Sequence, residues 1–181
     1  MTVWHYGDNI NTDQLFPGKY TYTCATPSEI VPHLLEDLDP TFVDTVKKGD
    51  VIVAGKNFGC GSSREQPVVG LKAVGIAAII AQSFARIFYR AAINQGLTLI
   101  QCPEAVVSYK KEDTIRIKPD QGELWMGEKK FRFPPLPPEI QAIGKAGGLL
   151  PYTKKKLHTQ VSPSKKKTLE KKERAVTNND E

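Results

Sequence analysis

Three short apolar runs, separated by two helical segments, restrict the fold of this chain more than any other feature. The runs are Asp50–Ala54, Ile76–Ala81 and Leu97–Gln101, each with the length and composition of a buried strand. The segments between them, Glu65–Val74 and Phe84–Gln95, have the length and spacing of helices. Strands joined by helices lie parallel, with right-handed crossovers. The middle of the chain therefore predicts a parallel sheet.

The second helical segment should pack one apolar face against that sheet. Its apolar side chains recur at helical spacing at Phe84, Ile87, Phe88 and Ala91, which predicts an inward stripe. Arg86 and Arg90 stand one turn apart, where packing, ion pairs or a subunit interface would use them.

The flanking segments add smaller elements. Val3–Tyr6 predicts a strand. The sequence Thr26-Pro-Ser-Glu29 is typical of a capping box with proline in the first turn, and predicts a helix through Leu38. Beyond Cys102, short alternating segments predict antiparallel strands at Thr114–Lys118, Leu124–Met126 and Lys130–Phe133, and a last helix at Pro138–Lys145.

Together these elements predict an α/β fold in one domain, residues 1–152, with a mainly parallel sheet flanked by helices and short antiparallel strands. Residues 153–181 are expected to form a basic, disordered tail. Residues 154–181 hold nine of the 25 Lys and Arg residues and four of the 20 Asp and Glu residues, so the body is neutral. With few apolar residues, the tail cannot bury enough surface to order itself. Contact with a polyanion would be an accessory property of this tail.

Composition excludes several classes of protein. No apolar run approaches the roughly 20 residues that a bilayer span needs, and the start has neither the basic nor the apolar region of a secretory signal. Cys24, Cys60 and Cys102 are an odd number of widely spaced thiols, which favours a reducing compartment and indicates a cytoplasmic protein. Their spacing fits neither a zinc site nor a ferredoxin-type cluster, so no metal site is predicted in this chain.

Residues 55–66, Gly-Lys-Asn-Phe-Gly-Cys-Gly-Ser-Ser-Arg-Glu-Gln, carry the most chemical information. Three glycines allow unusual backbone conformations and let a ligand approach the main chain closely. A helix that begins near Ser62–Glu65 would present free N–H groups to an anion, and Arg64 supplies a planar fork suited to a carboxylate. The segment therefore predicts a binding site for a small acid.

Other interpretations of this segment compete with that one. A serine-capped helix start after a glycine turn explains the composition equally well. The glycine and lysine order of a phosphate-binding loop is absent, and Gly59-x-Gly61 lacks the third glycine of a dinucleotide fingerprint. A stand-alone anion-binding module, or a nucleic-acid-binding protein that uses the tail, is a hypothesis of a different class.

Four motifs in order resemble a known family over residues 3–152. The segment 55–65 resembles the signature of 3-isopropylmalate dehydratase small subunits, which correspond to the swivelling β/β/α domain of aconitases. The other three matches are Gly7-Asp-Asn-Ile-Asn-Thr-Asp13, the segment 81–97 and Gly147-Gly-Leu-Leu-Pro-Tyr152. The resemblance implies a hydro-lyase of leucine biosynthesis that isomerises a hydroxy acid by losing and re-adding water.

The resemblance also implies roles for individual residues. Ser62 would be the catalytic base that removes a proton beside a carboxylate. Ser63 and Arg64 would bind the substrate carboxylate, and Thr12 and Asp13 would complete the substrate site. A four-iron, four-sulfur cluster would act as a Lewis acid on the leaving hydroxyl. The resemblance places that cluster on a large partner subunit, without which this chain would be inactive.

The loop after Pro17 would select the substrate. Related enzymes that accept a homoaconitate-type acid carry an arginine there, whereas this chain reads Tyr20-Thr-Tyr22-Thr23-Cys24. Burying a carboxylate without a partner is costly, so Tyr20, Tyr22 and Thr23 are expected to line a site for a small apolar branch. Isopropylmalate is the expected substrate, with dimethylmalate and homoaconitate as alternatives. Gln66 replaces the histidine usual in the family, which could alter rate or preference. Cys60 is expected to neighbour the substrate or serve structure.

Overall fold

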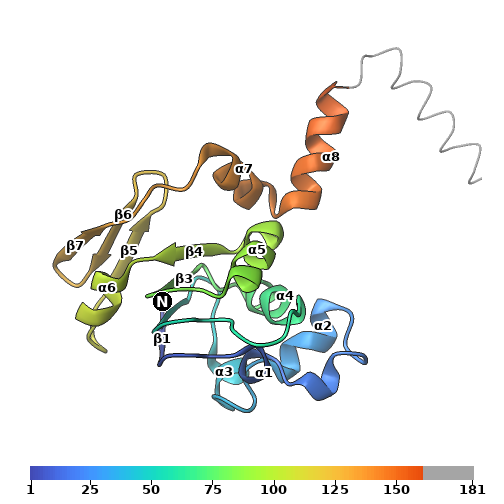
Figure 1. The fold of residues 1–181 in the computed structure, drawn as a ribbon, viewed down its shortest axis with the longest axis horizontal. Helices are drawn as coiled ribbons and strands as arrows, with labels where there is room; N and C mark the ends of the chain where they lie inside the picture. The colour runs from blue at the N-terminus through green and yellow to red at the C-terminus, as the bar shows by residue number, and fades with distance from the viewer. Residues whose placement is uncertain (161–181) are drawn as a thin grey trace, which may run out of the picture.

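A computed structural model describes residues 1–160 of the chain (Figure 1). Four parallel strands form the central sheet in the order β1-β2-β3-β4: β1 Val3–Tyr6, β2 Val51–Ala54, β3 Ala78–Ala81 and β4 Thr98–Gln101. Val3 pairs with Val51, Val51 with Ala78, and Ala78 with Thr98, so the four strands start level. The predicted parallel sheet is confirmed, and the carboxyl ends of its strands all meet at one edge.

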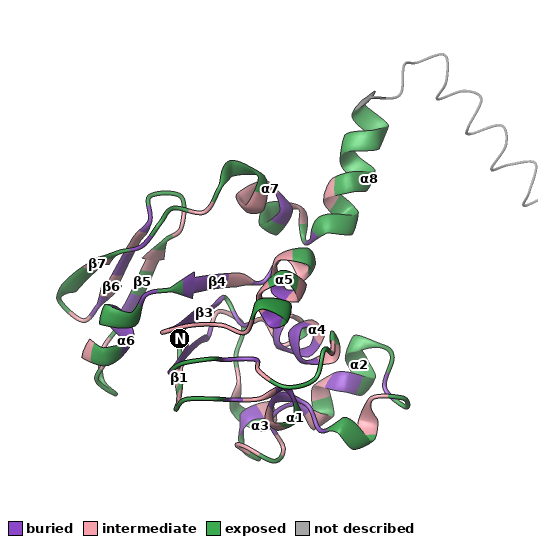
Figure 2. Ribbon diagram, in the orientation of Figure 1, coloured by how far each residue is buried: buried purple, intermediate pink, exposed green. Residues whose placement is uncertain are grey.

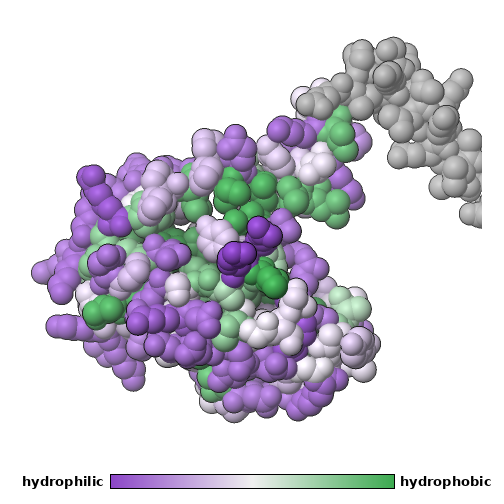
Figure 3. Space-filling model, in the orientation of Figure 1, coloured by the Kyte–Doolittle hydropathy of each residue, from purple (hydrophilic) through white to green (hydrophobic). Residues whose placement is uncertain are grey.

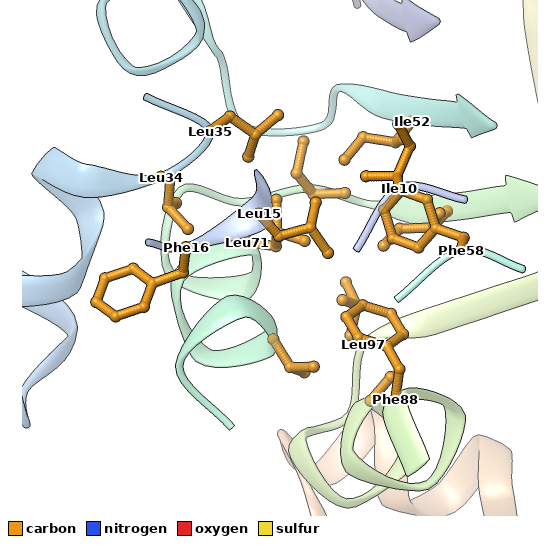
Figure 4. Packing of buried hydrophobic residues seen from close by; sticks show 14 of the residues in the cluster. Ile10, Leu15, Phe16, Leu34, Leu35, Ile52, Phe58, Leu71, Phe88 and Leu97 are labelled. Carbon is orange, nitrogen blue, oxygen red and sulfur yellow. The ribbon is translucent and has the colours of Figure 1, made fainter. Parts of the chain in front are cut away.

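Helices cover one face of this sheet. The long ones are α4 Gln66–Ala73 and α5 Arg86–Gln95, which connect the predicted strands. The connection from β1 to β2 adds short turns of helix: α1 Thr12–Leu15, η1 Gly18–Tyr20, α2 Pro27–Ile30, η2 Val31–His33 and α3 Phe42–Thr45. Their apolar side chains and those of one sheet face form a single buried cluster (Figure 4) that includes Leu15, Phe16, Ile52, Phe58, Leu71 and Phe88.

A second, smaller sheet covers the other face. Its antiparallel strands are β5 Ile115–Lys118, β6 Glu123–Met126 and β7 Lys129–Arg132, and α6 Pro103–Ser108 lies beside them. Side chains of alternating strand positions form a separate buried cluster that includes Val53, Ile80, Ile100, Val106 and Leu124. Because both faces of β2 and β3 are covered, all residues of these two strands are buried (Figure 2). The expected α/β architecture, with layers in the order helices, parallel sheet and antiparallel sheet, is confirmed.

The predicted helix from Pro27 to Leu38 is wrong in its length. The α-helix ends at Ile30, and a 3-10 turn carries the chain through Pro32. A proline inside a helix removes a backbone donor and clashes with the preceding turn. Leu35 then adopts a φ of 56°, which is incompatible with a continuous right-handed helix. The leucines near 34–38 are nevertheless buried or half-buried as core residues.

The C-terminal part of the described chain contains two helices. Helix α7 Pro138–Ala146 ends at Gly147, and another helix, α8 Leu149–Gln160, follows it. The domain boundary expected after Tyr152 therefore falls inside α8, and residues 153–160 are helical. The remainder of the expected tail lies outside the described residues. None of the helices in residues 1–160 combines the length and the apolar character needed to cross a bilayer.

Asp50 stabilises the start of β2. Its fully buried carboxylate accepts hydrogen bonds from the backbone N–H groups of Thr2 at 2.6 Å and Lys47 at 2.9 Å, and from the indole of Trp4 at 3.3 Å. Burial alone would raise the pKa of this carboxyl, but these donors and the charged N-terminus outweigh burial and lower the pKa. The charged form therefore stabilises the fold.

The variant Asp50→Asn is expected to lower the free energy of unfolding by about 2 kcal/mol at pH 7, because an amide places a donor against donors. Since the pKa of Asp50 is lowered on folding, its contribution is complete above the unfolded pKa of about 3.9. The contribution is lost as pH falls through the lower folded pKa. Urea denaturation of both proteins between pH 7 and pH 2.5 should show the gap closing below about pH 4. A matched change at the exposed Glu112, Glu112→Gln, should show no such gap.

Candidate functional site

The glycine-rich segment forms a tight loop at the carboxyl edge of the parallel sheet, between β2 and α4. Gly59 and Gly61 have φ values of 76° and 93°, conformations that glycine adopts without strain. Asn57 has a φ of 58°, in the left-handed region that asparagine tolerates better than most residues. Gly59 also has no space for a side chain. A Cβ built on it would lie 2.1 Å from Cγ of Phe88, so the loop backbone rests directly on the first turns of α5.

The loop does not lead straight into a helix at its serines. Helix α4 begins at Gln66, and its N-cap, Glu65, makes no capping hydrogen bond with its side chain. Ser62 and Ser63 are exposed and lie in irregular backbone before that start. The direct stabilisation of an anion at Ser62 by the helix N-terminus, which the sequence suggested, therefore has no support in this geometry. Pro67 in the first turn also removes one free N–H group from that end of the helix.

The N-terminal motif lies directly against this loop, although it is about 50 residues away in sequence. The backbone N–H of Thr12 donates to the Cys60 carbonyl at 2.8 Å, and the Thr12 hydroxyl donates to the Ser62 carbonyl at 3.0 Å. A capping box between Asn11 and Gln14 begins α1 at Thr12 and fixes its orientation. The two motifs that sequence analysis singled out therefore form one structural unit, in which Thr12 holds the main chain of Ser62.

Arg64 completes this unit. Its side chain is only 8% exposed, and its Nη2 lies 2.8 Å from Oδ1 of Asp13, whose side chain is 60% exposed. The same nitrogen lies 3.2 Å from the Thr12 hydroxyl, and Nη1 donates to the Phe16 carbonyl at 3.0 Å. Nε is buried and has no partner within residues 1–160. The guanidinium is thus held in a fixed place by α1, and a carboxylate already occupies one of its sides.

A hollow of about 290 Å³ opens beside Ser62 and Arg64. It is lined by Thr12, Gly59, Gly61, Ser62, Arg64, Ala85, Arg86, Ile87 and Phe88. Two hydroxyl groups, two guanidinium groups and an apolar wall therefore meet around a space suited to a small branched acid. A larger hollow of about 450 Å³ lies between α5, β4 and α7, where apolar surface gathers (Figure 3). None of the predicted catalytic or substrate-binding residues lines this second hollow.

The predicted burial of Ile87 is wrong. It was assigned to the inward stripe of α5, yet it is 58% exposed and lines the hollow beside Ser62. Helix α5 begins only at Arg86, so Ile87 lies in its first turn. Phe88 and Ala92 supply the buried face instead. An isoleucine in a first turn gives no sequence signal that distinguishes an exposed site residue from a core residue.

The expected substrate-selecting residues do not line this hollow. The Tyr20 ring stacks on His33 with centroids 3.7 Å apart, and its hydroxyl donates to Glu36 at 3.3 Å. Tyr22 is 99% exposed, and the Thr23 hydroxyl donates to the Tyr20 carbonyl at 3.3 Å. The loop instead contacts the site through Thr21, whose carbonyl accepts a hydrogen bond from Nε2 of Gln66 at 3.1 Å.

No metal or cluster site is formed by the described part of the chain. Within residues 1–160, no three His, Cys, Asp or Glu side chains lie close enough to hold a metal ion. Cys24 and Cys102 are buried, and Cys60 donates weakly to the Asn9 carbonyl at 3.5 Å. Within residues 1–160, the three cysteines therefore do not form a set of ligands for an iron–sulfur cluster.

Comparison with known proteins supports one family. A model of the aconitase C-terminal domain matches residues 7–105. The chain is 48% identical over 158 residues to the 3-isopropylmalate dehydratase small subunit of Moorella thermoacetica, covering 86% of this chain and 95% of that protein. It is 45% identical over 157 residues to that of Thermodesulfovibrio yellowstonii, covering 86% and 93%. A crystal structure of 3-isopropylmalate dehydratase from Methanocaldococcus jannaschii matches with a TM-score of 0.79 at 42% identity, covering 91% of this chain and 96% of that one.

Proposed function

Since the chain belongs to the aconitase C-terminal domain family, and within it to the small subunits of 3-isopropylmalate dehydratase, we propose that its Ser62–Arg64 loop is the catalytic site of that reaction. The protein is a hydro-lyase subunit of leucine biosynthesis, which works with a large subunit. The observation that carries the proposal is the convergence of the Thr12–Asp13 turn and the Ser62–Arg64 loop around one hollow.

Ser62 acts as the base in this proposal. Its exposed side chain lies at the rim of the hollow, on a loop whose backbone is fixed by Thr12. In its deprotonated form, the side-chain oxygen takes the proton from the substrate carbon beside a carboxylate and becomes a hydroxyl, which returns the proton when water is re-added. A free serine is a very weak acid and therefore needs stabilisation of its charged form. Because α4 begins only at Gln66, its N-terminus does not stabilise the charged form of Ser62 directly. We expect the large subunit to contribute this stabilisation when it closes over the loop.

Arg64 binds and orients the carboxylate beside that carbon. Because α1 holds the guanidinium through Thr12, Asp13 and Phe16, little conformational entropy is lost when substrate binds. Thr12 and Asp13 support Arg64 in this assignment, which replaces the direct substrate contacts expected from sequence. The exposed Asp13 carboxylate either stays bound to the Arg64 guanidinium together with the substrate carboxylate or is displaced by it. Ser63, the next residue of the loop, assists in binding the substrate carboxylate.

The same proposal places the four-iron, four-sulfur cluster on the large subunit. The family implies such a cluster, and the described residues of this chain offer no set of ligands for it. The cluster would supply Lewis-acid assistance to the departing hydroxyl, while this chain supplies the base and the carboxylate fork. The same proposal places the protein in the cytoplasm, because its thiols are reduced and its role is biosynthetic.

The proposed substrate is isopropylmalate. Ile87 gives the hollow an apolar wall that suits an isopropyl branch. Lys19 is the only basic residue of the loop after Pro17, and it pairs with Glu36 at 2.7 Å. This ion pair lowers the pKa of the Glu36 carboxyl, chiefly through the Lys19 hydrogen bond, and leaves that lysine engaged. An acid with a third carboxylate would find no free cation in this loop, although it would meet Arg86 at the wall of the hollow. Dimethylmalate is therefore the runner-up, and homoaconitate is the third candidate.

Reconstitution tests the proposal. The chain is purified alone and with its large subunit, and both preparations are assayed on isopropylmalate, dimethylmalate and homoaconitate side by side. We expect turnover only from the pair, highest on isopropylmalate. Turnover by the chain alone, or a pair that prefers homoaconitate, would refute the two-subunit assignment or the substrate assignment respectively.

A further inference from the structure

Gln66 connects the catalytic loop to the segment that follows α1. It is the first residue of α4 and half-buried, and its Nε2 donates to the Thr21 carbonyl at 3.1 Å across 45 residues of sequence. Among residues 1–160, no other group hydrogen-bonds to that carbonyl. The contact therefore fixes one end of the segment 17–21, which contains the short 3-10 turn η1.

Arg64 contacts the residue just before this segment and also approaches Thr21 at its end. Its Nη1 donates to the Phe16 carbonyl at 3.0 Å and lies 3.5 Å from the Thr21 hydroxyl. The segment in turn rests on the ion pair between Arg64 and Asp13. A Cβ built on Gly18 would lie 2.8 Å from Oδ1 of Asp13 and 3.3 Å from Nη1 of Arg64. Any displacement of this segment would therefore change the space around the guanidinium.

We propose that Gln66 is a positioning residue, which holds segment 17–21 against the Arg64–Asp13 pair and so keeps the carboxylate fork ready for substrate. This inference rests on the proposed function, because it assigns to Gln66 the support of the group that binds the substrate carboxylate. Gln66 lies outside the set of residues that line the hollow. Its effect passes through Thr21 and Gly18 to Arg64.

The expected kinetic signature is specific. With the reconstituted two-subunit enzyme and isopropylmalate as substrate, Gln66→Met keeps the length of the side chain but removes its donor. The KM should rise about tenfold, which corresponds to about 1.4 kcal/mol, while kcat stays within about twofold, because the base is untouched. Gln66→His, assayed at pH 8 where a neutral imidazole still donates an N–H, should recover most of the lost affinity.

A matched control separates positioning from general stability. Gln95 also donates from its side-chain amide, to Glu65 at 2.7 Å, but it does not touch segment 17–21. Gln95→Met should leave KM and kcat unchanged. If Gln66→Met lowers kcat at constant KM, or changes neither constant, the positioning role is refuted.

Amide hydrogen exchange gives a readout that does not depend on activity. In the full chain without substrate, Gln66→Met should speed exchange in residues 18–24 relative to wild type, whereas Gln95→Met should not. Unchanged exchange in that segment would refute the hold on Thr21. If the wild-type pair turned over none of the substituted malates, the proposed function would fail, and the exchange experiment would still decide the structural claim.

Discussion

Ser62→Ala is expected to lower the kcat of the reconstituted enzyme by about 10³–10⁴-fold, because it removes the only group in this chain assigned to take the proton. The KM should change little, since Arg64 and its supports stay in place. The fold should also survive, because the contact that fixes Ser62 uses its backbone carbonyl, which alanine retains. Turnover of isopropylmalate and co-elution of the two subunits measure these two claims separately.

The neighbouring hydroxyl supplies the control for this prediction. Ser63 is exposed, as Ser62 is, but it does not line the hollow. Ser63→Ala is therefore expected to alter KM by no more than about tenfold and to keep most of kcat. If Ser62→Ala retained normal turnover, or if Ser63→Ala were the inactive variant, the assignment of the base to Ser62 would be wrong.

The alternation of strands and helices between Asp50 and Gln101 could be predicted because it depends on local pattern. Predominantly apolar runs of five or six residues have few alternatives to a buried strand once helical segments separate them. The parallel order follows from connection length. Both features are confirmed, with strand bounds within two residues of the predicted ones.

The failures of prediction arose where tertiary contacts outweigh local pattern. Apolar spacing favoured a helix through Leu38, but Pro32 ends the α-helix, and the following leucines reach the core from irregular backbone (Figure 4). Ile87 has the spacing of a core residue, yet it lies at the exposed first turn of α5. Helix α8 was missed because its side chains are mostly exposed (Figure 2), so it lacks a clear apolar stripe.

The candidate site, too, could be predicted where it depends on local sequence and not where it depends on tertiary contacts. Motif chemistry pointed to Ser62 and Arg64, since glycines, a hydroxyl and a guanidinium together suit an acid. The contacts that hold Arg64 could not be predicted, because Thr12, Asp13 and Phe16 are about 50 residues away in sequence. Gln66 appeared as a departure from a family pattern. Only the structure shows that its amide reaches Thr21.

Gly59→Ala is expected to be the most destabilising single methyl addition in the catalytic loop. The φ of 76° costs an alanine about 1 kcal/mol. The new Cβ would also lie 2.1 Å from Cγ and 2.5 Å from Cβ of Phe88, and relief of such overpacking costs a further 1–3 kcal/mol, roughly. Together these terms predict a loss of about 3 kcal/mol and a fall in Tm of about 10 °C. Because the loop can only move away from α5, the hollow beside Ser62 should change shape, and activity should fall even in the folded fraction.

A double-mutant cycle with Phe88 tests the cause of this destabilisation. Phe88 is buried, and its ring packs edge-on against Phe58 with centroids 5.3 Å apart, so Phe88→Ala alone should cost about 3–5 kcal/mol. In the double variant the contact with the Phe88 ring is absent, but the alanine at position 88 keeps its Cβ, which would still lie 2.5 Å from the new methyl. The double variant should therefore lose about 1 kcal/mol less than the sum of the two single losses. Gly144→Ala is the matched control, since that glycine lies within α7 and a Cβ there meets nothing within 4 Å. This control should stabilise the protein by about 0.5–1 kcal/mol. Strict additivity of Gly59→Ala and Phe88→Ala would show that the contact with the Phe88 ring does not make glycine necessary at this position.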